Sequence, residues 1–164
     1  MEIKNNTKIL KITHDDLVNL FCTALEGNNW VSCEYDKEFY NSLKVGQVEG
    51  DCDEDHIADV LLNGGNVYLF DEYAEGEIYG KKGEVIEDDG DGTVMYTINL
   101  EDVIQGLENA FNGSIKSSDF NDSGMKSWVR DCVEELADEE CCDLDLPMAD
   151  ALLQIIMFNE VIYG

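Results

Sequence analysis

The sequence predicts an α+β fold, in which an antiparallel sheet of four to five strands is packed by four to five helices in a single domain. The chain has 164 residues, a length typical of one domain. Hydrophobic residues make up 44% of it, enough for a core despite the high charge. Its strand-like segments follow one another through turns rather than alternating regularly with helices, which favours antiparallel pairing. We therefore expect one acidic domain over residues 1–164, with residues 1–7 frayed.

The chain begins with a strand and a well-capped helix. Residues 8–12 alternate as in a strand, and Thr13 is typical of a helix N-cap. Asp15 and Asp16 then suit the positive end of the helix dipole. The helix ends at Gly27, and its apolar residues recur on one face: Leu17, Val18, Phe21, Ala24 and Leu25.

A strand and a second, shorter helix follow. Residues 30–35 are rich in strand-forming side chains, whereas residues 39–48 have no clear pattern. Asp53 is expected to cap a helix over residues 54–62, because a short apolar face follows it and a Gly-Gly pair ends it.

The middle of the chain predicts the remaining strands. Residues 66–70 and 93–98 are the clearest of them. Residues 77–79 and 84–86 flank the turn-forming segment 80–83, which predicts a hairpin between them.

Three helices complete the prediction. Asn99 caps a helix over residues 100–111, a second helix covers residues 125–137, and Pro147 opens a last helix that reaches Asn159. The last helix is apolar on nearly every side, which is typical of a central helix or of one in an oligomer interface. We expect it in the core, and a homodimer contact through this C-terminal helix is the alternative to a monomer.

The most informative feature of the composition is its charge. The chain carries 37 acidic and 10 basic residues, a formal net charge of −27. No basic residue occurs in residues 45–80, in residues 83–115 or after Arg130. Such segregation favours a surface built to meet a basic partner, and solubility is the alternative explanation. Direct binding to nucleic acid or to an anionic membrane is excluded, because phosphate groups would be repelled.

Two acidic segments are the candidate partner-binding residues. In the helix over residues 125–137, carboxylates recur at helical spacing opposite the apolar face, and no basic residue follows to neutralise them. A solvated polar face is an equally good interpretation of this stripe. The candidates are Asp131, Glu134, Glu135 and Asp138, continuing into Glu139, Glu140, Asp143 and Asp145, and a second set of Asp51, Asp53, Glu54 and Asp55.

Metal binding has weak support. The spacing of Asp51, Asp53 and Asp55 resembles the start of an EF-hand loop, but His56 occupies the position that requires glycine. A second such start, around Asp89 and Asp91, lacks the final bidentate glutamate. The six cysteines form no C-x-x-C pair and are expected to be reduced.

Catalysis has little support either. His14 and His56 lie at predicted helix starts with no nucleophile motif beside them, and phosphate-binding and metalloprotease motifs are absent. We therefore expect no catalytic residue, no metal, no cofactor and no enzymatic activity.

Several segments together resemble a family of small, acidic, uncharacterised proteins encoded by phages and prophages of Gram-positive gut bacteria. They are residues 21–27 followed by Trp30, Asn63-Gly64-Gly65 before residues 67–71, residues 96–111 and residues 149–164. The resemblance implies a phage origin. Small acidic phage proteins are often similar to anti-restriction or anti-CRISPR inhibitors, whose targets have basic nucleic-acid channels.

These observations lead to one hypothesis and one rival. The hypothesis is an inhibitor in the cytoplasm of the infected host that acts as a nucleic-acid mimic and occupies the basic surface of a CRISPR-Cas effector or a restriction enzyme. The rival is a small enzyme or sponge acting on a nucleotide immune signal, for which Lys81, Lys82 and Arg130 are the candidate phosphate-binding residues. A virion or housekeeping protein with an acidic coat is a third possibility.

Overall fold

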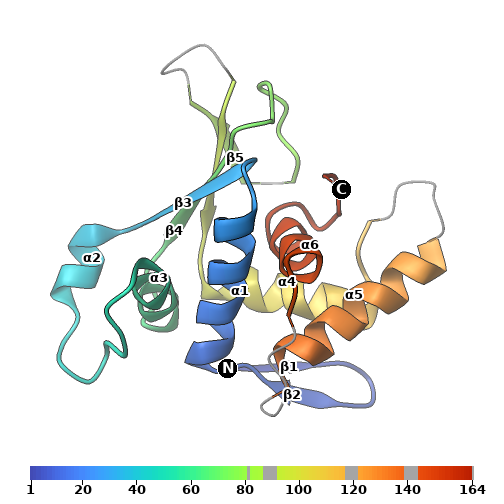
Figure 1. Ribbon diagram of the computed structural model, residues 1–164, viewed down its shortest axis with the longest axis horizontal. Coiled ribbons are helices and arrows are strands. Elements are labelled where there is room, and N and C mark those ends of the chain that lie inside the picture. Colours follow the sequence, from blue (N-terminus) through green and yellow to red (C-terminus); the bar gives the residue numbers. More distant parts are fainter. Residues whose placement is uncertain (81, 87–91, 117–121, 139–143, 164) are drawn as a thin grey trace.

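The computed structural model describes residues 1–80, 82–86, 92–116, 122–138 and 144–163 (Figure 1). These residues form a four-stranded antiparallel sheet, a two-stranded sheet and six helices in one compact domain, which confirms the predicted α+β class.

The N-terminus is a hairpin of two short strands. Strand β1 (Glu2–Lys4) pairs antiparallel with β2 (Ile9–Lys11), so that Ile3 lies opposite Leu10. Both of these side chains are buried in the core. The expectation that residues 1–7 are frayed is therefore wrong for residues 2–4, because pairing with β2 carries Ile3 into the core.

The larger sheet has the order β3 (Val31–Tyr35), β4 (Val67–Asp71), β6 (Val94–Ile98) and β5 (Gly83–Val85), all antiparallel. The strands predicted near residues 30–35, 66–70 and 93–98 are confirmed. The predicted hairpin is wrong, since residues 77–79 form no strand and β5 pairs with β6 instead. Lys81, in the expected turn, lies outside the described residues.

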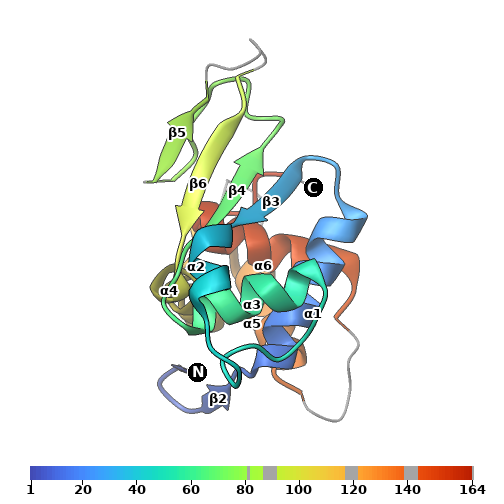
Figure 2. The same cartoon turned by 90° about the vertical axis from the view of Figure 1, so that its left-hand side faces the viewer.

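Helices cover only one face of this sheet. Along β4, Val67, Leu69 and Asp71 are buried, whereas Tyr68 and Phe70 between them keep partial exposure. The same alternation holds in β6. In Figures 1 and 2 the helices gather below and to one side of the sheet, whose β5 end projects beyond them.

The helices surround the last one, α6 (Leu146–Phe158), which is buried from Ala151 to Phe158. This confirms the expected core position, while a homodimer contact through α6 stays a prediction. Helices α1, α4 and α5 all pack against α6. The other helices are α1 (His14–Gly27), α2 (Lys37–Ser42), α3 (Asp53–Leu62), α4 (Leu100–Asn112) and α5 (Asp122–Leu136).

Local caps set most helix starts. The Thr13 side chain accepts from the Asp16 backbone N–H, and the Asp16 carboxylate accepts in return from the Thr13 N–H at 2.7 Å. Asn99 caps α4 in the same reciprocal way. The cap predicted at Asp53 is wrong by one residue, because Cys52 is the N-cap and Asp53 is already helical.

A buried amide fixes the C-terminal segment to α6. The Gln154 amide nitrogen donates to Asp150 at 2.7 Å and to the Tyr163 carbonyl at 2.8 Å. Its amide oxygen accepts from the backbone N–H groups of Ile162 and Tyr163. Trp30 donates its indole N–H to the same Asp150 carboxylate at 2.8 Å, so that α6, the chain end and the start of β3 are joined.

The close contact between α4 and α6 depends on Gly106. A Cβ at this position would lie 2.7 Å from the Ile156 Cα, closer than real Cβ contacts allow. We expect Gly106→Ala to lower the free energy of unfolding by about 1–2 kcal/mol, since the cost of overpacking exceeds the helix propensity that alanine adds. Urea denaturation measures the change, and Gln105→Ala, at an exposed neighbour on the same helix, is the control with a small effect. Equal stability of Gly106→Ala and the parent would contradict this role.

Candidate functional site

Helix α5 presents the acidic stripe that the sequence predicts. Val129, Cys132 and Val133 are fully buried on one face, and Leu136 is nearly so. On the other face, Asp131 is exposed and Glu134 and Glu135 are partly exposed, and the exposed Asp138 follows two residues beyond the end of the helix. The helix thus anchors its apolar face in the core and holds the carboxylates of the stripe on a fixed support.

One positive charge reaches this stripe from a distant part of the chain. The Lys8 ammonium, just before β2, lies 3.2 Å from a Glu134 carboxylate oxygen. The expectation that no basic residue neutralises the row is wrong at this position. The side chains are 52% and 42% exposed, so the pair contributes no more than about 1 kcal/mol of stability. Asp131 and Glu135 have no ion-pair partner in the described part of the chain.

Of the predicted acids from Glu139 to Asp145 that continue the stripe, the structure describes only Asp145. Glu139, Glu140 and Asp143 lie outside the described residues. Asp145 is the N-cap of α6, where its carboxylate accepts from the Met148 backbone N–H at 3.0 Å. Asp145 therefore stabilises the start of α6 as well as adding charge to the surface.

The second acidic set lies at the start of α3. Asp51 and Asp53 are exposed, and Glu54 is partly buried. The Asp55 carboxylate accepts from the Cys52 backbone N–H at 3.1 Å. Hydrogen bonds from the Cys52 thiol and backbone lower the pKa of Asp55. Asp55 is thus a capping residue, whereas the exposed Asp53 carboxylate lies 3.9 Å from His56 Nδ1.

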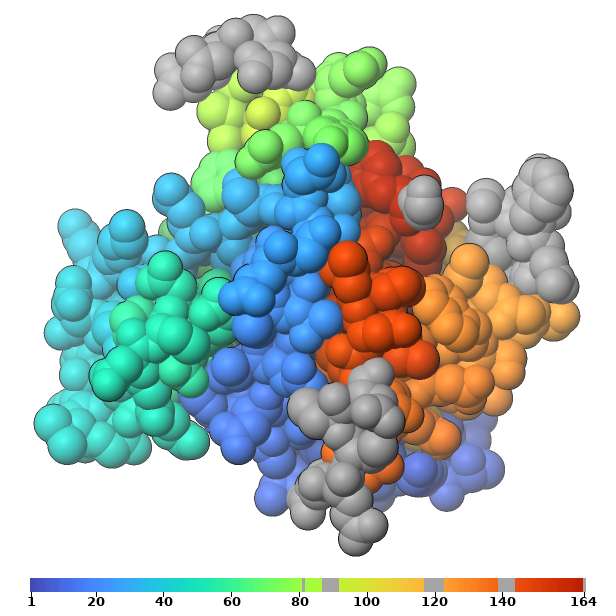
Figure 3. Space-filling view, in the orientation of Figure 1, coloured from blue at the N-terminus to red at the C-terminus, as the bar shows by residue number. Residues whose placement is uncertain are grey.

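The two acidic sets lie on opposite sides of the molecule. Figure 1 shows α3 on one side of α1 and α5 on the other, and the space-filling view keeps them apart (Figure 3). α1 lies between them and itself exposes Asp15 and Glu26. The predicted residues therefore form two surfaces rather than one patch, and the α5 stripe is the more regular of the two.

The basic residues considered for a phosphate pocket are not brought together. The Lys82 ammonium is paired with the Asp102 carboxylate. The Arg130 guanidinium donates to the Phe111 carbonyl at 3.1 Å. These two partners are nine residues apart on α4, or about 13 Å along its axis. Lys81 is not described, so the rival nucleotide-binding hypothesis gains no pocket from these residues.

The two histidines link helices to their neighbours. His14, the first residue of α1, is buried, and its Nε2 lies 3.3 Å from the buried Asp59 carboxylate of α3. His56 shares a 3.0 Å hydrogen bond with the Tyr35 hydroxyl and stacks against Tyr40. Among the described residues, no three His, Cys, Asp or Glu side chains are placed to hold a metal ion.

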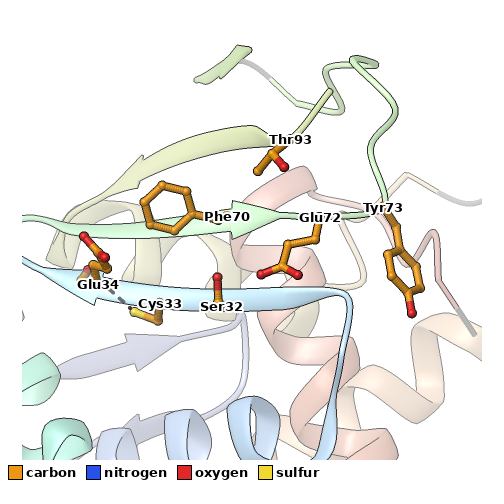
Figure 4. Close-up of a pocket in the computed structure, with 7 residues that line it drawn as sticks. All are labelled: Ser32, Cys33, Glu34, Phe70, Glu72, Tyr73 and Thr93. Atoms are coloured by element: carbon orange, nitrogen blue, oxygen red, sulfur yellow. Dashed lines mark hydrogen bonds between the residues drawn. The ribbon is translucent and has the colours of Figure 1, made fainter. Parts of the chain in front are cut away.

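The open face of the sheet carries a hollow that the sequence did not reveal. It has a volume of about 490 Å³ and spans β3, the end of β4 and the start of β6 (Figure 4). Phe70 lies between Glu34 and Glu72 in this view. We call it the sheet hollow, and its lining residues are Ser32, Cys33, Glu34, Phe70, Glu72, Tyr73 and Thr93.

The described lining of the sheet hollow is negatively charged. Glu34 and Glu72 are exposed, and neither carboxylate has a hydrogen-bond or ion-pair partner among the described residues. No Lys or Arg is among the described residues that line the hollow. The Cys33 side chain points to the helix side of β3 (Figure 4), and burial raises the pKa of its thiol to about 12, which excludes a reactive thiolate.

Asp71 supports the sheet hollow from the buried face. Its carboxylate accepts from the Tyr163 hydroxyl at 2.9 Å and from the Tyr73 backbone N–H at 3.0 Å. Burial is the largest influence on this group and raises the pKa of Asp71. The residue therefore links the C-terminal segment to the rim of the hollow.

No known protein family, curated protein or solved structure shows significant similarity to this chain. The resemblance to phage-encoded acidic proteins therefore stays a prediction. Within the described ranges, no helix is both long and apolar enough to span a membrane.

The raised pKa of Asp71 gives a stability prediction with a definite sign. The ionised carboxylate costs stability above its unfolded pKa, and the cost disappears as pH falls through the folded pKa. Asparagine is neutral and can still accept from Tyr163 and Tyr73. We expect Asp71→Asn to be more stable than the parent at pH 7, with the gap narrowing as pH falls to 5. Urea denaturation at pH 7, 6 and 5 measures this, with the exposed Asp131→Asn as control. A gap that widens on acidification would contradict it.

Proposed function

We propose that this chain is a non-enzymatic inhibitor of a host defence nucleoprotein, a CRISPR-Cas effector or a restriction enzyme. Its acidic surface occupies the basic groove that this protein uses for DNA or RNA. The observation that carries the proposal is the stripe on α5, whose carboxylates stand on a helix anchored in the core. Asp131 and Glu135 of this stripe have no neutralising partner among the described residues.

The charge density of the stripe supports mimicry of a nucleic-acid strand. On α5, Asp131, Glu134 and Glu135 place carboxylates at i, i+3 and i+4, and Asp138 follows two residues beyond the end of the helix. At the rise of an α-helix, the three helical carboxylates span about 6 Å, or about one per 3 Å of axis. Each strand of B-DNA carries one phosphate per about 3.4 Å. A row of Lys and Arg side chains that follows a phosphate backbone can therefore follow this helix with a similar spacing.

The position of the stripe on a fixed helix matters as much as its density. Each pair of like charges on one helix face destabilises the helix by about 0.2–0.5 kcal/mol. The buried face of α5 compensates this repulsion through Val129, Cys132 and Val133. A basic groove that binds the stripe removes the repulsion, so that complex formation is favoured without a change of backbone.

The net charge of −27 adds a long-range component. It accelerates encounter with a positively charged groove and disfavours contact with nucleic acid itself. An acidic coat that serves solubility alone has the same net charge but needs no ordered stripe, and this difference separates the two interpretations experimentally.

Charge reversal on α5 tests the proposal. Asp131→Lys with Glu135→Lys leaves the Lys8–Glu134 ion pair in place. We expect this double variant to bind a guide-loaded, RNA-guided nuclease at least tenfold more weakly, and we expect parent binding to weaken steeply between about 0.05 and 0.2 M salt, as phosphate contacts do. Surface-based binding assays across a salt series measure both effects.

The matched control reverses two exposed acids elsewhere, Glu38→Lys on α2 and Glu101→Lys on α4. It changes the net charge equally but leaves the stripe intact, so its affinity should stay within about threefold of the parent if position matters more than net charge. Pull-down from lysate of a bacterial host with the parent and both double variants extends the test to other defence proteins. Equal losses in both variants, or a response that is flat with salt, would contradict mimicry by α5.

A further inference from the structure

We infer that the sheet hollow is an arginine-binding anchor, which takes one arginine side chain of a basic protein partner between Glu34 and Glu72 and against Phe70. The inference rests on the proposed function for the nature of the partner. It adds a second contact surface, on a different element and with a different chemistry from the α5 stripe.

The first argument is the uncovered aromatic side chain. Phe70 lies on the face of β4 that none of the described helices covers, opposite Ser32 of β3 and Met95 of β6. Its ring is partly exposed although the sheet has a full helical layer on its other side. Large aromatic rings contribute most of the binding energy in many protein interfaces when a partner buries them.

The second argument is the charge around that ring. Glu34 and Glu72 flank Phe70 in Figure 4, and neither carboxylate has a partner among the described residues. Within the part of the chain that the structure describes, no basic residue lines the hollow. An aromatic face with a carboxylate on each side is complementary to a flat cation, since the ring attracts positive charge to its face and the carboxylates accept hydrogen bonds at the edges.

The third argument selects arginine over lysine. A guanidinium group is planar, stacks on aromatic rings and donates five N–H bonds in a fixed fork, whereas an ammonium group is a compact, strongly hydrated charge. The sheet hollow offers several acceptors for such a fork: the two carboxylates and the hydroxyl groups of Ser32 and Thr93. Tyr73, which is 52% exposed, lines the far end of the hollow beyond Glu72 (Figure 4).

Arginine is also the residue that the proposed partner would supply. Nucleic-acid-binding proteins use the guanidinium fork to contact phosphate oxygens, and carboxylates accept from the same fork with similar geometry. An arginine in a phosphate-binding groove therefore needs no change of chemistry to bind Glu34 and Glu72.

The test uses the whole protein and two blocked peptides, hexa-arginine and hexa-lysine, in 0.15 M NaCl. Titration followed by ¹⁵N–¹H NMR should shift the backbone amides of residues 32–34, 70–73 and 93 with hexa-arginine. Hexa-lysine should bind these residues at least threefold more weakly. Phe70→Leu keeps an apolar side chain but removes the aromatic face, and it should abolish the preference for arginine. Met95→Leu, on the neighbouring strand of the same face, should preserve it.

A second variant tests the sheet hollow independently, in case Phe70→Leu does not fold. Glu34→Gln with Glu72→Gln retains the size of both exposed side chains and should reduce hexa-arginine binding at the hollow at least fivefold. Equal affinity for the two peptides, or shifts confined to α5, would overturn the inference.

The experiments can contradict the proposed function and the arginine-binding anchor independently of each other. Asp131→Lys with Glu135→Lys leaves the sheet hollow intact, so hexa-arginine should still shift residues 32–34 and 70–73 in that variant. Loss of those shifts would show that the peptide follows overall charge rather than the hollow, and would overturn the anchor. Retention of the shifts together with no binding to any nuclease would contradict the proposed function and support the anchor.

Discussion

The side-chain amide of Gln154 makes the buried polar contact on which the rest of the structure depends. Apart from Gln154 and its partner Asp150, helix α6 is apolar, so α1, α4 and α5 can pack around it at the same time. The amide satisfies its hydrogen bonds with Asp150 and with the backbone of Ile162 and Tyr163. Tyr163 in turn reaches Asp71 of β4 and packs against Trp30. Core, chain end and sheet are thus joined on one side. Because every described helix lies on that side, no described helix covers the opposite face of the sheet, which carries the hollow around Phe70.

The negative charge of this protein has two structural origins. Part of it caps helices: the carboxylates of Asp16, Asp36, Asp55, Asp102 and Asp145 accept from backbone N–H groups at helix starts. These groups contribute to stability through hydrogen bonds and the helix dipole. A few others, such as Asp71, Asp150 and Glu134, bind side chains of distant segments. Asp131, Glu135, Glu34 and Glu72 have no hydrogen-bond or ion-pair partner among the described residues. The helix-capping acids are already occupied, so only the unpaired carboxylates are candidates for contact with a partner. These residues define a smaller surface than the net charge would suggest.

The parts of the fold that the sequence predicted well depend on contacts within a few residues. Thr13, Asn99 and Pro147 mark helix starts because a cap needs only the next three residues, and the stripe on α5 follows from its 3.6-residue period. Apart from the one-residue shift of the cap predicted at Asp53, the errors involve distant partners. β1 exists because Ile3 meets Leu10 and the core, and β5 pairs with β6 rather than with residues 77–79. Lys8 and Glu134 are 126 positions apart. The sheet hollow needs three strands and an uncovered face, although aromatic residues on the outward positions of β4, Tyr68 and Phe70, were a local sign of it.

The central place of α6 has a consequence for biosynthesis. Its residues, 146–158, are made after every helix that packs on it. At translation rates of about 5–20 residues per second, α6 is synthesised a second or more after α1, α4 and α5, whose apolar faces have no α6 to pack against until then. During that interval the nascent chain holds its core-forming side chains uncovered, a state prone to aggregation. Its dense negative charge makes such chains repel one another, so the acids that shape the finished surface also protect the unfinished chain.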